Sequence, residues 1–159
     1  MQPQNIKNNK MKNYDKLFMD IAERTAKESN CVKYKVGCVI VLDNRVIIQG
    51  YNGTVPGFTN CSDKFPDGAT SEKNKIEHRI WGDSFELHAE MNCIIYAAKK
   101  GIPILGTWMY CTHKPCNNCL KHIIAVGITK VVYKYDYEDN NKIHEITELL
   151  SKIQLIKKS

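Results

Sequence analysis

Hydrophobic and polar positions alternate along the chain with two different periods, which divide it into helices and strands. Apolar residues at helical spacing predict an amphipathic helix over about residues 13–29. Two β-branched runs, 36–42 and 46–51, are separated only by Asp43-Asn44-Arg45 and predict a β-hairpin. The remaining predicted elements are helices over 88–100, 115–127 and about 141–151, and strands over 107–112, 130–135 and 153–157 as a last edge strand.

The order of these elements predicts an α/β protein, because strands that alternate with helices form a sheet covered by helices on both faces. Residues 52–85 show no clean periodicity, and a stretch of that length without its own structure is usually functional. No repeat or domain boundary is visible. We therefore expect a single domain over 13–159, preceded by a flexible polar tail over 1–12.

The composition narrows the class of protein. The 159 residues are 43% hydrophobic and 25% charged, which is enough for one ordinary core. No apolar run approaches the roughly 20 residues of a membrane span, and the polar N-terminus does not resemble a secretory signal. We therefore expect a cytoplasmic protein. The net charge is +6, but only three of the 23 basic residues are arginines, so an extended nucleic-acid surface is not expected.

Seven cysteines are many for this length. In a chain without a signal peptide they favour metal binding or reactive thiols over disulfides. Two short segments carry ligand spacing: His88-Ala89-Glu90 and Pro115-Cys116-Asn117-Asn118-Cys119. Cys116 and Cys119 are three residues apart at the start of a predicted helix, so they share one face, and the helix N-terminus favours their thiolates.

His88, Cys116 and Cys119 therefore form a candidate zinc site with three protein ligands. The fourth tetrahedral position stays open, which is typical of a catalytic site. Glu90 points to another side of its helix, so we expect it to move a proton from a zinc-activated water to a ring nitrogen, with ammonia as the leaving group. Cys-x-x-Cys alone is also compatible with a redox pair or half of a structural zinc ribbon. Together the two segments match the zinc-deaminase signature His-x-Glu…Pro-Cys-x-x-Cys.

These segments resemble the cytidine and deoxycytidylate (dCMP) deaminase superfamily, and in particular its phage and viral dCMP deaminases. Val36-Gly37, Gly50-Tyr51-Asn52-Gly53, Gly57-Phe58 and Asn60-Cys61 extend the resemblance, which covers about Cys31 to Tyr135. It implies a three-layer α/β/α fold with a mixed, roughly five-stranded sheet. It also implies hydrolysis of dCMP to dUMP and ammonia, which supplies the precursor of dTMP.

The resemblance implies a second, structural zinc held by Cys31, Cys61, His78 and Glu86. Four protein ligands close such a site, and the metal would pin residues 52–87 to the body of the domain. The alternative is that the two cysteines are ordinary buried thiols and that His78 is a surface residue. The other three thiols (Cys38, Cys93 and Cys111) are expected to pack as small hydrophobes.

Substrate contacts follow only from the resemblance. Asn52 is expected to bind the sugar or the base, Tyr133 to line the pocket, and Lys33 or Lys35 to bind the 5′-phosphate, although either lysine is compatible with an ordinary solvated charge. No ligand role is expected for three histidines: His113, which borders the pocket, His122 and His144.

Family members are commonly homohexamers that dCTP activates, with Mg²⁺ accompanying the nucleotide, and that dTTP inhibits. The same behaviour is expected here, although Lys99-Lys100 stands where regulated members often have arginine. Three alternatives are a tRNA adenosine deaminase, a cytidine deaminase acting on nucleosides or dCTP, and a non-catalytic zinc module. The scarcity of arginine disfavours the first, and Glu90 disfavours the last, since a binding module has no use for a proton carrier.

Overall fold

The computed structural model of the chain describes residues 13–137 and 146–159. Its elements are α1 (Asp15–Ala26), β1 (Gly37–Leu42), β2 (Arg45–Tyr51), β3 (Gly53–Thr54), α2 (Cys61–Lys64), α3 (Glu72–Phe85), β4 (Glu86–Leu87), α4 (Ala89–Lys100), β5 (Trp108–His113), α5 (Asn117–Ala125), β6 (Lys130–Tyr135), α6 (Ile146–Leu150) and β7 (Gln154–Lys157). The expected tail over 1–12, His144 and the first part of the helix predicted over 141–151 lie outside the described residues. Among the helices that are described, none combines the length and the apolar character needed to span a bilayer.

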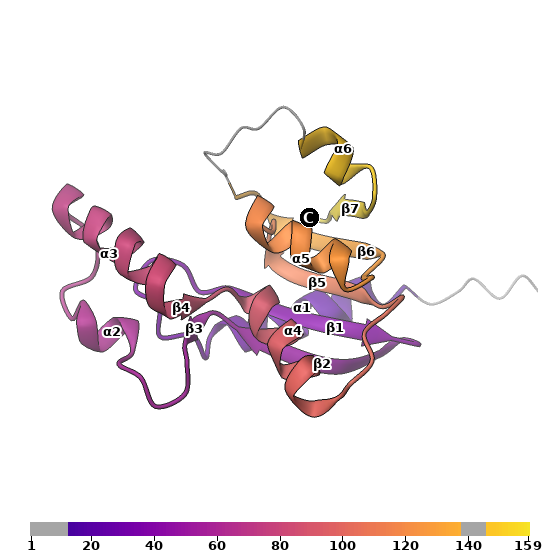
Figure 1. Ribbon diagram of the computed structural model, residues 1–159, viewed down its shortest axis with the longest axis horizontal. Helices are drawn as coiled ribbons and strands as arrows, with labels where there is room; N and C mark the ends of the chain where they lie inside the picture. The colour runs from indigo at the N-terminus through magenta and orange to yellow at the C-terminus, as the bar shows by residue number, and fades with distance from the viewer. Residues whose placement is uncertain (1–12, 138–145) are drawn as a thin grey trace, which may run out of the picture.

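Five strands form one mixed sheet in the order β2-β1-β5-β6-β7 (Figure 1). β1 pairs antiparallel with both β2 and β5, whereas β5, β6 and β7 run parallel to one another. Parallel neighbours need a crossover connection, and α5 supplies it between β5 and β6. The mixed five-stranded sheet and the edge strand β7 confirm the sequence-based predictions.

Helices cover both faces of this sheet. Along β1, Val39 and Val41 pack with Phe18 of α1 on one face, while Cys38 and Ile40 pack on the opposite face in a core shared with α4 and α5. In Figure 1, α4 and α5 lie in front of the sheet and α1 lies behind it. The predicted three-layer α/β/α architecture is therefore confirmed.

A two-residue turn joins β1 to β2. Its residues, Asp43 and Asn44, have φ angles of 48° and 59°. Two positive φ angles define the type I′ turn, whose twist matches that of a hairpin, and Asp and Asn tolerate this region better than most residues. The hairpin is confirmed, with Arg45 as the first residue of β2 and not part of the turn.

Gly37 opens β1 where α1 lies directly against the strand. A Cβ atom at this position would stand 2.0 Å from the backbone oxygen of Ala22 and 2.6 Å from the backbone nitrogen of Ala26. Both neighbours are backbone atoms that cannot turn aside. The glycine of the Val36-Gly37 pair therefore allows the close packing of α1 on the sheet.

The segment over 52–85 carries more regular structure than its irregular pattern suggests. It contains β3, α2 and the 14-residue helix α3, and it leads into β4, which pairs with β3. We call residues 53–87 the arm, because Figure 1 shows them projecting from one end of the sheet. Within α3 only His78 is buried, while Trp81 and Phe85 pack with Phe58 of the arm. The apolar side of the helix is narrow, and its local signal is the Ser71 side chain, which caps the backbone N–H of Asn74.

Candidate metal centres and active site

Three of the predicted zinc ligands meet where two helices begin. His88 is the N-cap residue of α4, Cys116 is the N-cap residue of α5, and Cys119 lies in the first turn of α5. His88 Nδ1 lies 3.5 Å from Cys116 Sγ and 3.4 Å from Cys119 Sγ. All three ligand atoms lie within 4.8 Å of one another. We call these residues the three-residue cluster.

Hydrogen bonds within this cluster polarise its side chains. The hydrogen bond with Cys119, together with that to His88, lowers the pKa of the Cys116 thiol to about 4. The hydrogen bond between His88 and Cys116 raises the pKa of His88 to about 9. The hydrogen bond between Cys119 and Cys116, together with burial, raises the pKa of Cys119. Cys116 is therefore a thiolate at neutral pH, which is the form of cysteine that binds metals.

The donors of the three-residue cluster fit zinc. Two sulfur atoms and one imidazole nitrogen are a donor set that zinc prefers, and they lie close enough to share one ion. Three protein ligands leave a tetrahedral ion one position for water or substrate. The cluster is thus suited to a catalytic metal more than to a closed structural one.

Glu90 lies beside the three-residue cluster but is not part of it. It is in the first turn of α4, is only 4% exposed, and is hydrogen-bonded to Cys119. Burial raises the pKa of its carboxyl group. A carboxyl held in this way near a metal site can take up and release a proton without being a ligand.

The four residues expected to hold a second metal also lie together. Cys31 follows α1, Cys61 begins α2, His78 lies within α3, and Glu86 begins β4. His78 Nε2 is 3.2 Å from Cys61 Sγ and 3.7 Å from Cys31 Sγ, and Cys31 Sγ is 3.9 Å from Glu86 Oε2. Their four ligand atoms lie within 4.8 Å of one another. We call them the four-residue cluster.

The chemistry of this second cluster also fits a cation. Glu86 Oε1 is buried and has no hydrogen-bond partner among the described residues, which is costly for a carboxylate oxygen unless a positive charge lies nearby. Burial raises the pKa of the Cys61 thiol to about 12, so a metal that binds here displaces its proton. Because the cluster offers four protein donors, a metal bound to it would be closed to substrate.

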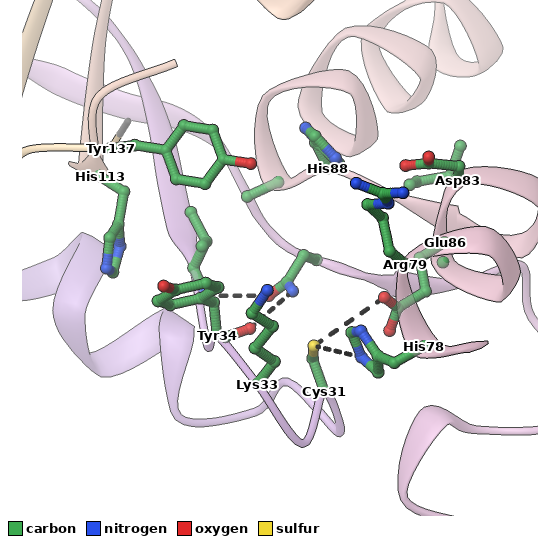
Figure 2. A pocket seen from close by; sticks show the side chains of 15 residues that line it. Cys31, Lys33, Tyr34, His78, Arg79, Asp83, Glu86, His88, His113 and Tyr137 are labelled. Carbon is green, nitrogen blue, oxygen red and sulfur yellow. Dashed lines mark hydrogen bonds between the residues drawn. The ribbon is translucent and has the colours of Figure 1, made fainter. Parts of the chain in front are cut away.

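A cavity of about 150 Å³ connects the two clusters. Its lining includes Cys31, His78 and Glu86 of the four-residue cluster, and His88 of the three-residue cluster. Figure 2 shows these side chains, with those of α3 on one side of the cavity and those of the loop before β1 on the other. Residues of both clusters therefore border one space that is open to a small ligand.

Two of the four expected substrate contacts line this cavity: Asn52 and Lys33. Asn52 Oδ1 accepts a hydrogen bond from the Val36 backbone N–H, and Asn52 Nδ2 donates one to the Tyr34 carbonyl, both at 2.8 Å. One lone pair and one N–H of this amide remain for a ligand. The side chain thus anchors the loop before β1 and also borders the cavity.

Tyr133 and Lys35, the other two expected substrate contacts, are not among the residues that line this cavity. Tyr133 is buried within β6 and is hydrogen-bonded to Asp136. Lys35 is exposed just before β1. The two residues before it, Lys33 and Tyr34, both line the cavity.

Several lining residues carry no signal in the sequence. Tyr34, Arg79, Asp83 and Tyr137 come from the loop before β1, from α3 and from the end of β6. Arg79 and Asp83 could not be assigned, because α3 itself was not predicted. His113 borders the cavity as expected, and burial lowers the pKa of its imidazole.

The thiols without a ligand role are core residues, as predicted. Cys38, Cys93 and Cys111 are fully buried, and Cys38 Sγ lies 3.3 Å from Cys111 Sγ on the neighbouring strand. Burial raises the pKa of both Cys38 and Cys111, which keeps them as inert thiols. His122 is exposed near the end of α5 and lies outside both clusters.

Comparison with known proteins places the chain in a family. Residues 12–135 match the model described as the cytidine and deoxycytidylate deaminase zinc-binding region. The chain is 33% identical to deoxycytidylate deaminase of Enterobacteria phage T4 over 150 residues, which cover 77% of this chain and 78% of the phage protein. It is 39% identical to the Saccharomyces cerevisiae deoxycytidylate deaminase over 124 residues, which cover 78% of this chain and 38% of the yeast protein.

A solved structure extends the likeness to the fold. The dCMP deaminase of cyanophage S-TIM5, crystallised in complex with dCMP and dUMP, superposes with a TM-score of 0.70 at 31% identity. The alignment covers 99% of this chain and 99% of the cyanophage chain. The sheet, the helices and both candidate metal clusters described above lie within it. This chain belongs to the zinc-binding cytidine and deoxycytidylate deaminase family.

Proposed function

We propose that this chain hydrolyses dCMP to dUMP and ammonia, which supplies the precursor of dTMP. The observation that carries the proposal is the three-residue cluster beside the buried Glu90, with His88 lining a cavity of about 150 Å³. The phage and yeast relatives are deoxycytidylate deaminases, and the cyanophage relative was crystallised with dCMP and dUMP. Both the chemistry of the site and the names of the relatives support the same reaction.

In this proposal His88, Cys116 and Cys119 hold a catalytic zinc ion. When bound, zinc acts as a Lewis acid that makes water nucleophilic near neutral pH. The two cysteines supply thiolate charge from the N-terminus of α5, and His88 supplies a nitrogen ligand from the start of α4. Because both helices pack in the central core, they hold the three donors in a fixed arrangement.

Glu90 acts as the proton carrier. The oxygen of water adds to C4 of the cytosine ring, and the bond between C4 and the amino nitrogen then breaks. The second proton of the water passes to the departing amino group, which leaves as ammonia while the C4 carbonyl of dUMP forms. Glu90 takes a proton from the attacking water and delivers it to the ring nitrogen next to C4, so the ring bears no full negative charge during addition. Its burial at the head of α4 keeps the carboxyl group away from bulk water that would compete for the proton.

The cavity lining supports two substrate contacts. Asn52 has one acceptor site and one donor site left to bind the sugar or the base. Lys33 supplies positive charge for the 5′-phosphate, since its side chain borders the cavity and that of Lys35 does not. Both roles are proposals that follow from position and hydrogen-bonding capacity.

Further properties of the family extend the proposal. The four-residue cluster holds a structural zinc, and the protein is a homohexamer that dCTP with Mg²⁺ activates and dTTP inhibits. The donor set of the four-residue cluster supports the metal, and the resemblance to regulated deaminases supports the rest. Light scattering after size exclusion, and assays with and without each nucleotide, test the assembly and the regulation separately.

The substitution Glu90→Gln tests the mechanism. It preserves the shape of the side chain and removes its proton-carrying role, so we expect dCMP turnover to fall by at least about 100-fold. Zinc content, measured by atomic absorption, should stay at the wild-type level, and the exposed control Glu148→Gln should retain wild-type turnover. Near-wild-type activity of Glu90→Gln would falsify the role of Glu90, and no deamination of dCMP by the wild-type protein would refute the function itself.

A further inference from the structure

Two cationic side chains from opposite sides border the cavity. Lys33 comes from the loop before β1, and Arg79 comes from α3 (Figure 2). The lining also holds the carboxyl groups of Asp83 and Glu86, and Glu86 belongs to the four-residue cluster. Lys33 and Arg79 are therefore the permanent positive charges that the described lining offers to an anionic ligand.

Arg79 differs from the other two arginines of the chain. Arg24 forms an ion pair with Glu28 at 2.5 Å on the surface of α1, and Arg45 lies at the start of β2, away from the cavity. Arg79 forms no ion pair or hydrogen bond with any residue in the described part of the chain, although Asp83 stands four residues later on the same helix. All five guanidinium N–H groups of Arg79 are therefore free to bind a ligand.

The four-residue cluster fixes the segments that carry both cations. Cys31 stands two residues before Lys33, and His78 directly precedes Arg79. The contacts of His78 Nε2 with the sulfur atoms of Cys31 and Cys61 tie α3 to the loop before β1. The cluster thus sets the spacing between the backbone at Lys33 and the backbone at Arg79.

We propose that Arg79, together with Lys33, binds the 5′-phosphate of the substrate, and that it makes the chain select nucleotides over nucleosides. The inference rests on the proposed function, since it concerns the same cavity and the same substrate. A phosphate monoester carries nearly two negative charges and accepts paired hydrogen bonds from a guanidinium group. A nucleoside offers no such group, so its binding does not depend on Arg79.

Binding of the product by calorimetry tests this role without relying on turnover. We expect Arg79→Ala to raise the Kd of dUMP by about 10- to 100-fold and to leave the Kd of deoxyuridine unchanged. This factor is the range for losing charge-assisted hydrogen bonds. Arg79→Lys should recover part of the loss, because it restores the charge but not the paired geometry. Inorganic phosphate should compete with dUMP in the wild-type protein and less effectively in Arg79→Ala.

The control is Lys73→Ala, which removes one positive charge from the exposed surface of α3 outside the cavity. It should bind dUMP as the wild-type protein does. The metal content and melting temperature of Arg79→Ala should also match the wild-type values, which shows that the neighbouring His78 is undisturbed.

Two outcomes would overturn the inference. One is a Kd for dUMP within twofold of the wild-type value in Arg79→Ala, and the other is an equal loss of dUMP and deoxyuridine, which indicates a structural effect. A separate assay keeps the proposed function distinguishable. If the wild-type protein deaminates dCMP but Arg79→Ala binds dUMP normally, only the role of Arg79 fails.

Discussion

The two clusters of candidate metal ligands differ in how the chain builds them. The three-residue cluster sits at the beginnings of α4 and α5, two helices that pack on the central sheet. The four-residue cluster joins the loop after α1 to the arm, where α3 buries only His78. The first cluster is thus held by a core that exists without it. The second cluster is itself a large part of what holds the arm.

This contrast matches the number of donors. A site with three donors leaves room for chemistry, and it needs an independent framework to keep its geometry. A site with four donors is closed, and its binding free energy is available for folding. We therefore expect damage to the first cluster to remove activity and damage to the second to loosen structure.

Replacing a donor of the three-residue cluster gives the largest expected effect. Cys116→Ser removes one sulfur ligand, so bound zinc should fall by one equivalent per chain. Turnover of dCMP should drop by more than about 100-fold, because even the loss of a residue that only hydrogen-bonds to a metal ligand costs up to roughly that factor. The melting temperature should stay near that of the exposed neighbour control Asn118→Ser. Loss of the folded state in Cys116→Ser would contradict the view that the core alone holds this site.

Replacing a donor of the four-residue cluster should have the opposite profile. His78→Ala removes the ligand that contacts both sulfur atoms, and we expect a loss of about 2–4 kcal/mol in unfolding free energy. Limited proteolysis with mass spectrometry should show faster cleavage within residues 53–87, while the zinc of the three-residue cluster remains bound. Unchanged protease resistance relative to the exposed control Glu77→Ala would remove the distinction between the clusters.

A pair of glycine substitutions tests the same contrast without touching a ligand. Gly37→Ala places a methyl group against the backbone of α1 and should cost about 1–3 kcal/mol. Gly53→Ala, in the arm, has no atom within 4 Å of the added methyl group and should be nearly neutral. Chemical denaturation measures both. Equal stabilities for the two variants would show that α1 is not packed as tightly as described.

The smallest effect concerns a carboxyl group far from both clusters. Burial tends to raise the pKa of Asp15, but hydrogen bonds from Tyr110 and Lys158 outweigh burial and lower it. A lowered pKa stabilises the folded state above the unfolded-state value near pH 4, and this stability is lost as the pH falls through the folded-state value. Asp15→Asn should therefore reduce stability at pH 6 by less than about 1 kcal/mol, and it should flatten the decline in melting temperature between pH 5 and pH 3.

The parts of the molecule that the sequence predicted are those with a local signal. The turn at Asp43 and Asn44 and the helix starts after His88 and Cys116 depend on residues that are adjacent in the chain. The strands followed from runs of β-branched and apolar residues, which are buried on both faces of the central strands. The family resemblance brought together Cys31 and Glu86, which no spacing rule connects.

The parts that were missed depend on contacts between distant segments. α3 has a largely exposed surface and only a narrow apolar side, so its helical pattern was not recognised, and Arg79 was missed with it. Tyr133 is buried within β6 and does not line the cavity, because a position near the end of a strand does not decide whether a side chain faces the cavity or the core.

The seven cysteines differ in exposure, so their reactivity toward a thiol reagent reports on the state of the three-residue cluster. Six are buried, and only Cys116 is partly accessible to solvent. It is also the thiol that is ionised at neutral pH. In the metal-free protein, a thiol-specific dye should therefore modify one sulfur per folded chain quickly and the others only after unfolding. The number of fast-reacting thiols would then measure, in a single spectrophotometric reading, which fraction of the folded chains carries no metal in the three-residue cluster.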